Sequence, residues 1–187
     1  MIRIVGLSGS LRAGSLNTAL LRAAVELAPG GCEIVAESIR DVPLYDGDRE
    51  AAEGLPPAVV RLKAAVSAAD GLLLVTPEYN NGIPGVFKNA IDWMSRPGSD
   101  IPQVFGDKPV GVIGASPGPF GTILSQNAWL PVLRTLRTDP WFGGRLMVPR
   151  AAALFAEGRL VDDAMRERLS DYLAGFAAYI AARGGKT

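Results

Sequence analysis

The chain has 187 residues, of which 48% are hydrophobic, and its 19 basic and 19 acidic side chains give a formal net charge of zero. This length and composition predict a single domain, 1–187, with a substantial core, and the zero charge argues against nucleic-acid binding, which needs a basic surplus. No apolar run approaches membrane-spanning length, and the single Cys32 cannot form an internal disulfide, so we expect a cytoplasmic protein with neither membrane nor nucleic-acid partners.

Apolar runs typical of strands alternate with amphipathic segments typical of helices. In chain order they are a strand at 2–7, a helix at 15–28, a strand at 33–39, a helix from Pro57, a strand at 71–77, a helix from Pro84, a strand at 109–115, a helix at 122–137, a weaker strand at 145–149 and a helix at 162–183. Pro131 predicts a kink or a late start in the fourth helix. The alternation predicts an α/β fold, an open parallel sheet with helices on both faces.

Unusual loops follow three of these strands. They read SGSLRAGS after the first strand, TPEYNNGIPG after the third and SPGPFG after the fourth. In a flavodoxin-like, doubly wound sheet of five parallel strands in the order 2-1-3-4-5, these three strands are adjacent at the centre. Ligands in such folds bind beyond the carboxyl ends of the strands, at the topological switch point, so we expect the three loops to form one binding site.

The first loop is predicted to bind a phosphate. Gly9 and Gly14 have the spacing of a Walker A loop, but Ser15 and Leu16 stand where its lysine and its hydroxyl residue would be, so a nucleoside-triphosphate site is not predicted. A helix start, several hydroxyls and the guanidinium of Arg12 together suit a phosphate monoester held without a metal. The alternative is a strand–helix turn that needs only flexible residues.

The loop after the third strand is predicted to hold a flat heteroaromatic ring. Tyr79 offers an aromatic face, Asn80 and Asn81 offer amides, and Gly82 and Gly85 allow close approach of the backbone. Taken alone, the loop is also compatible with a turn that carries an incidental tyrosine.

The segments GSLRAGSLN, PEYNNGIPGVFKNAIDW and GASPGPFGTILSQ, in this order, resemble the NADPH-dependent FMN reductase family, flavodoxin-like flavoenzymes that include quinone, chromate and azo-dye reductases. The resemblance implies that FMN lies across the three loops. The implied phosphate contacts are Ser10, Arg12, Ser15, Leu16 and Asn17, the implied contacts of the isoalloxazine are Pro77, Glu78, Tyr79 and Asn80, and Ser116 and Gly118 flank it from the third loop. Thr122 and Leu124 stand where many members have a glycine and an arginine.

The sequence contains no histidine, which removes Ser-His-Asp and Cys-His catalysis as well as the commonest transition-metal ligand. We expect a bound cofactor to supply the chemistry, and we assign no catalytic side chain and no metal. The resemblance implies an FMN-dependent oxidoreductase that takes hydride from NADPH or NADH and passes two electrons, by ping-pong transfer, to a quinone, a flavin, an azo compound or a metal oxyanion such as chromate. The alternatives are a flavodoxin-type electron carrier and a flavin-free interaction module.

The helix from Pro84 is apolar over an unusually wide arc. One stripe holds Phe87, Ala90, Ile91 and Met94, while Val86 and Trp93 lie on a second face. Such a helix must bury more than one side. Either it is deeply buried within the monomer, or it forms a homodimer or homotetramer interface, which the family resemblance favours.

Overall fold

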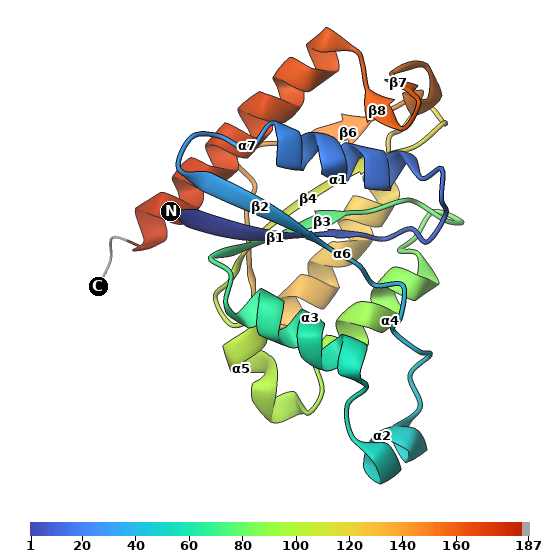
Figure 1. Cartoon of the computed structure of the whole chain (residues 1–187), viewed down its shortest axis with the longest axis vertical. Helices are drawn as coiled ribbons and strands as arrows, with labels where there is room; N and C mark the ends of the chain where they lie inside the picture. The colour runs from blue at the N-terminus through green and yellow to red at the C-terminus, as the bar shows by residue number, and fades with distance from the viewer. Residues whose placement is uncertain (185–187) are drawn as a thin grey trace.

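The computed structural model describes residues 1–184 and contains a parallel sheet between two layers of helices (Figure 1). The main strands are β1 (Ile2–Ser8), β2 (Cys32–Glu37), β3 (Gly71–Val75) and β4 (Pro109–Ala115). With the short β5 (Asp139–Pro140) they pair in the order β2-β1-β3-β4-β5, which confirms the predicted flavodoxin-like order. β1, β3 and β4, the strands that precede the three unusual loops, therefore lie side by side at the centre.

The sheet separates two apolar cores. Helices α1 (Leu16–Glu26) and α7 (Asp163–Gly184) cover one face, and α3 (Pro57–Ser67), α4 (Gly85–Met94) and α6 (Ile123–Thr135) cover the other (Figure 1). All five residues of β3 are buried, with Leu73 and Val75 in the first core and Leu72 and Leu74 in the second, because successive strand residues point to opposite faces. α6 begins at Ile123 and continues through Pro131, so the late start does not occur.

The fifth position of the sheet differs from the prediction of one strand at 145–149. Two short strands, β5 (Asp139–Pro140) and β6 (Leu146–Val148), pair with the beginning and the end of β4. Between them, the ring of Trp141 packs 4.9 Å from that of Tyr172 and 5.5 Å from that of Phe176. The pairing along this edge of β4 is interrupted only between the two short strands, at Gly111 and Val112.

Short elements also occur that the sequence analysis does not predict. They are α2 (Gly47–Glu53), the 3-10 turn η1 (Gly98–Asp100), α5 (Ile101–Val104), the 3-10 turn η2 (Ala151–Ala153), and the antiparallel hairpin of β7 (Phe155–Ala156) and β8 (Arg159–Leu160). Each is too short to show a clear apolar period in the sequence.

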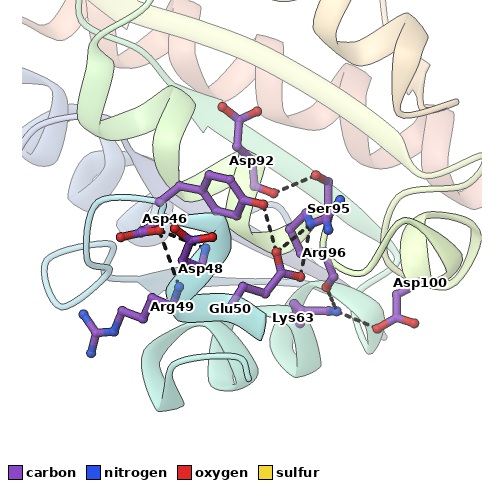
Figure 2. A network of polar contacts seen from close by, with 10 residues as sticks. Asp46, Asp48, Arg49, Glu50, Lys63, Asp92, Ser95, Arg96 and Asp100 are labelled. Atoms are coloured by element: carbon purple, nitrogen blue, oxygen red, sulfur yellow. Dashed lines mark hydrogen bonds and ion pairs between the residues drawn. The ribbon is translucent and has the colours of Figure 1, made fainter. Parts of the chain in front are cut away.

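Polar contacts hold the α2 segment against its neighbours, because α2 itself buries no side chain (Figure 2). The Glu50 carboxylate accepts hydrogen bonds from Arg96 Nε at 2.9 Å and from the Tyr45 hydroxyl at 2.9 Å. Beside it, Lys63 of α3 donates to Asp100 at 2.6 Å and to the carbonyl oxygen of Arg96. This network ties α2, α3 and the end of α4 together.

The second apolar face of α4 is partly covered within the chain. Trp93 is fully buried, its indole N–H donates to the Pro43 carbonyl at 2.9 Å, and the ring of Tyr45 packs edge-on at 4.9 Å. Burial within the monomer therefore accounts for Trp93, whereas Val86 remains 36% exposed. No helix among residues 1–184 is long and apolar enough to cross a membrane.

Candidate cofactor site

The three loops meet above the centre of the sheet. The first loop (residues 9–15) follows β1, the second loop (residues 76–84) follows β3, and the third loop (residues 116–122) follows β4. β1 and β4 both pair with β3, so all three loops leave the same edge. Hydrogen bonds between the loops and the neighbouring elements then fix how each one projects.

The first loop presents unpaired donors at the start of α1. A β-carbon at Gly9 would lie 2.2 Å from the ring of Phe87, so only glycine fits where the loop leaves the strand. Ser15 caps α1, its hydroxyl oxygen accepting from the Thr18 N–H at 3.1 Å, which leaves its own hydroxyl proton free to donate. The N–H groups of Leu16 and Asn17 lie in the first helical turn, where no acceptor exists within the helix.

Arg12 and Ser10 complete this donor set. Arg12 is exposed, and within residues 1–184 its guanidinium makes no hydrogen bond or ion pair. Beside the loop lies a cavity of about 260 Å³ that Ser10 and Arg12 line together with Arg22 and Arg40. Free N–H groups, hydroxyls and guanidinium groups around a helix N-terminus fit a phosphate dianion.

The side chain of Asn17 faces the sheet instead. Its amide nitrogen donates to the Ala115 carbonyl at 2.8 Å, its amide oxygen accepts from the Ala115 N–H at 2.9 Å, and the residue is only 5% exposed. Asn17 therefore ties the start of α1 to the end of β4. Contact with a phosphate is left to its backbone N–H, a division of roles that the sequence analysis does not predict.

The second loop is a tight hairpin. Tyr79 and Gly82 exchange two backbone hydrogen bonds, at 3.2 and 3.0 Å, around Asn80 and Asn81. Both asparagines have positive φ, 50° and 61°, as a type I′ turn requires. The turn leaves Tyr79 46% exposed beside Asn80, so an aromatic face and an amide are available to a planar ligand.

A buried polar cluster anchors the strand end below this hairpin. The Thr76 hydroxyl donates to the Pro77 carbonyl at 2.9 Å and accepts from the Trp129 indole N–H at 3.1 Å. It also lies 2.9 Å from the Ser125 hydroxyl. These residues were not singled out from the sequence, because a lone threonine, serine or tryptophan carries no local signal of such a contact.

Glu78 holds the second loop to α6. Its carboxylate accepts from the N–H groups of Leu124 at 2.9 Å and Ser125 at 3.0 Å. The residue before the helix, Thr122, has a left-handed φ of 69° and makes no capping hydrogen bond with its side chain. Glu78 therefore supplies the missing cap from another loop, and its negative charge lies at the positive end of the helix dipole. This role was not predicted either.

The third loop is fixed by the chain that follows β6. Ser116 donates its N–H to the Val148 carbonyl at 3.0 Å and accepts from the Ala151 N–H at 3.0 Å, and the Gly118 carbonyl accepts from the Arg150 N–H at 2.9 Å. Space is open around Gly118. Leu124, where the family resemblance implies an arginine, is 45% exposed, so this end of the site carries an apolar side chain.

Comparisons with known proteins place the chain in a family. The family model described as NADPH-dependent FMN reductase matches residues 2–153. The chain is 43% identical to an NAD(P)H-dependent FMN reductase of Pseudomonas aeruginosa over 180 residues, covering 96% of this chain and 95% of that protein. It is 36% identical to a quinone reductase of Escherichia coli over 185 residues, again covering 96% and 95%.

A solved structure gives the same result. FerB, a flavoenzyme NAD(P)H:(acceptor) oxidoreductase from Paracoccus denitrificans, superposes with a TM-score of 0.85 at 33% identity, covering 97% of this chain and 98% of FerB. The matches cover nearly the whole chain, and the family model spans all three loops. The chain belongs to the NADPH-dependent FMN reductase family, whose members are flavin-using oxidoreductases.

Proposed function

We propose that this protein is an FMN-dependent NAD(P)H oxidoreductase that passes two electrons, by ping-pong transfer, to a quinone or another flat acceptor such as a free flavin, an azo compound or a metal oxyanion. The observation that carries the proposal is the joint placement of an unpaired donor set in the first loop and an exposed aromatic hairpin in the second. The names of the relatives, an NAD(P)H-dependent FMN reductase and a quinone reductase, support NAD(P)H as the electron donor and a quinone as the electron acceptor.

In this proposal the three loops hold FMN in distinct ways. The phosphate lies against Ser10, Arg12, Ser15 and the backbone N–H groups of Leu16 and Asn17. The ring lies against Pro77, Tyr79 and Asn80 of the second loop and Ser116 and Gly118 of the third. When bound, FMN supplies the two-electron chemistry between a nicotinamide and the acceptor.

The chain's own residues orient the reactants. Glu78 is engaged by two helix N–H groups, so its role in the proposal is to position the second loop and not to transfer protons. Tyr79 covers one face of the ring site and limits the access of water. We assign no catalytic side chain, and we keep NADPH and NADH both as donors. We further propose a cytoplasmic homodimer or homotetramer that uses the exposed Val86 side of α4.

The test is an anaerobic titration of the purified protein. The FMN-loaded protein should bleach to the two-electron reduced form on addition of NADPH or NADH and recover on addition of a quinone. A protein that binds FMN but is not bleached by either nucleotide would instead be an electron carrier. A protein that binds no FMN would contradict the whole assignment.

Arg12→Ala tests the phosphate site. Loss of a charge-assisted hydrogen bond of about 1.5–3 kcal/mol should weaken FMN binding roughly ten- to hundredfold. Arg168→Ala, which removes an exposed arginine from α7, is the matched control and should leave the FMN dissociation constant unchanged. Equal FMN affinity in the two variants would refute the phosphate assignment.

A further inference from the structure

A buried hydroxyl at the base of the second loop has no role in the function proposed so far. Thr76 follows β3 and is fully buried, and its N–H donates to the Ile113 carbonyl of β4 at 2.8 Å, so the sheet fixes its position. Its hydroxyl contacts the Pro77 carbonyl and two residues of α6, Ser125 and Trp129, which are also fully buried. Buried polar groups cost free energy unless they are hydrogen-bonded, so these contacts decide what the hydroxyl does.

The direction of each hydrogen bond at this hydroxyl is fixed. A hydroxyl group has one proton and two acceptor lone pairs. The proton of Thr76 points to the Pro77 carbonyl oxygen, 2.9 Å away, and one lone pair accepts from the Trp129 indole N–H at 3.1 Å. At the remaining contact, 2.9 Å from the Ser125 hydroxyl, Ser125 is therefore the donor. The two residues of α6 thus leave the Thr76 proton directed at Pro77.

This contact sets the plane of the peptide group between Pro77 and Glu78. The bond is trans, so its C=O and its N–H point in opposite directions. Because the Pro77 carbonyl points toward Thr76, the Glu78 N–H points away from the buried cluster. This N–H has no acceptor within residues 1–184, whereas the next N–H in the chain, that of Tyr79, is used inside the hairpin. One free donor is therefore held in a set direction beside the exposed tyrosine.

A second contact with α6 restrains the same peptide group. The Glu78 carboxylate accepts from the Ser125 N–H at 3.0 Å, while the Ser125 hydroxyl donates to Thr76. Ser125 therefore restrains both sides of the peptide, through Thr76 on the carbonyl side and through the Glu78 side chain on the other. The peptide cannot rotate without breaking the buried hydrogen bond between Thr76 and Pro77. A donor held in this way avoids part of the ordering cost of binding.

We infer that Thr76 is a positioning residue for the flavin: its hydroxyl holds the Pro77–Glu78 peptide so that the Glu78 N–H donates to the edge of the isoalloxazine. The inference rests on the proposed function and adds to it a residue that does not itself touch FMN. The ring edge carries carbonyl oxygens and nitrogens, which supply the acceptor that this N–H lacks. Hydrogen bonds to a flavin ring are one of the ways in which a protein tunes its electronics. The competing role of Thr76 is a purely structural one in the core below the loop.

The experiment compares Thr76→Val, which keeps the shape of the side chain without the hydroxyl, with Thr76→Ser, which keeps the hydroxyl. Dissociation constants are measured without NAD(P)H for FMN and for riboflavin, which has the ring but no phosphate, together with the midpoint potential of bound FMN. Loss of one aligned hydrogen bond to the ring should weaken the binding of both flavins by the same factor, roughly two- to tenfold, and shift the potential. Thr76→Ser should retain the parent values.

Thr138→Val is the matched control, because the Thr138 hydroxyl also donates to a backbone carbonyl, that of Leu133 at 3.0 Å, but just beyond the far end of α6. It should leave both dissociation constants and the potential unchanged. If Thr76→Val does not fold, Ser125→Ala takes its place. It removes one of the two donors to the Thr76 hydroxyl, so it should produce the same changes to a smaller extent.

Flavin affinities and a potential equal to those of the parent, with only a lower midpoint of thermal unfolding, would overturn the inference and leave Thr76 a structural role. A larger loss for FMN than for riboflavin would also overturn it, because the substitution would then act on the phosphate site. Flavin binding that depends on the Thr76 hydroxyl, in a protein that neither NADPH nor NADH reduces, would keep the inference and refute the proposed function instead.

Discussion

Asn17→Ala separates a structural role of this residue from direct contact with the cofactor. The substitution removes both hydrogen-bond partners of Ala115, whose N–H and C=O are bound at 2.9 and 2.8 Å in a buried setting. Each buried backbone group left without a partner costs about 1–3 kcal/mol, so the free energy of unfolding should fall by about 2–6 kcal/mol. For a chain of this size, the midpoint of thermal unfolding should fall by at least about 4 °C.

The assay is thermal unfolding of the apoprotein followed by circular dichroism, together with the FMN dissociation constant. Ser10→Ala is the control, since Ser10 lies in the same loop but holds no buried backbone group. It should weaken FMN binding and leave the unfolding midpoint unchanged. If Asn17→Ala were as stable as the parent and lost only FMN affinity, Asn17 would be a cofactor ligand and the role read from its contacts would be wrong.

Other predictions concern Glu78, Glu50 and Tyr172. Glu78→Ala should lower the free energy of unfolding by about 1 kcal/mol in urea titrations, as loss of a helix cap does, while Glu78→Gln, which keeps an acceptor, should lose less. The hydrogen bond from Arg96 lowers the pKa of Glu50 from 4.5, so the ionised Glu50 stabilises the fold above pH 4.5 and this stabilisation is lost as the pH falls through the folded pKa. Hydrogen exchange of α2 should therefore accelerate as the pH falls through that value, whereas Glu50→Gln should show no such acceleration. Tyr172→Phe should change the free energy of unfolding by less than about 1 kcal/mol, because the hydroxyl, whose pKa burial raises, makes no hydrogen bond of good geometry within residues 1–184.

The sheet was predictable because its strands are buried on both faces. Residues 109–115 were expected as a strand and form β4 with the same bounds, and the helix expected from Pro57 begins there. In both cases a local pattern carries the information: a continuous apolar run in the strand, and a proline at the first turn of the helix. The alternation of elements then predicts a parallel sheet, while the order of the strands and the convergence of the three loops follow from the flavodoxin-like fold that was assumed for it.

The contacts that shape the site left no such pattern. Asn17 bonds a residue 98 positions away, and Glu78 bonds one 46 positions away, so neither pair produces a periodic signal. The strand expected at 145–149 forms as β6 because LMV is apolar, whereas β5 at Asp139–Pro140 was missed because two residues carry no apolar pattern. Polar side chains that cap or bridge elements distant in the sequence become visible only once the chain is folded.

The two bridges have a joint consequence for cofactor affinity. Asn17 joins the first loop to β4, and Glu78 joins the second loop to the helix that follows the third, so together they hold the three loops in one arrangement before FMN binds. Binding to a preorganised site avoids the cost of ordering loops, so cutting either bridge should weaken FMN binding even where the lost side chain makes no contact with it. Because the two bridges hold the two ends of the third loop, the losses in binding free energy in Asn17→Ala and Glu78→Ala should not add: the double variant should deviate from their sum by at least about 0.5 kcal/mol. Strict additivity in a double-mutant cycle of FMN dissociation constants would mean that the loops are held independently and that the site is not preorganised as a unit.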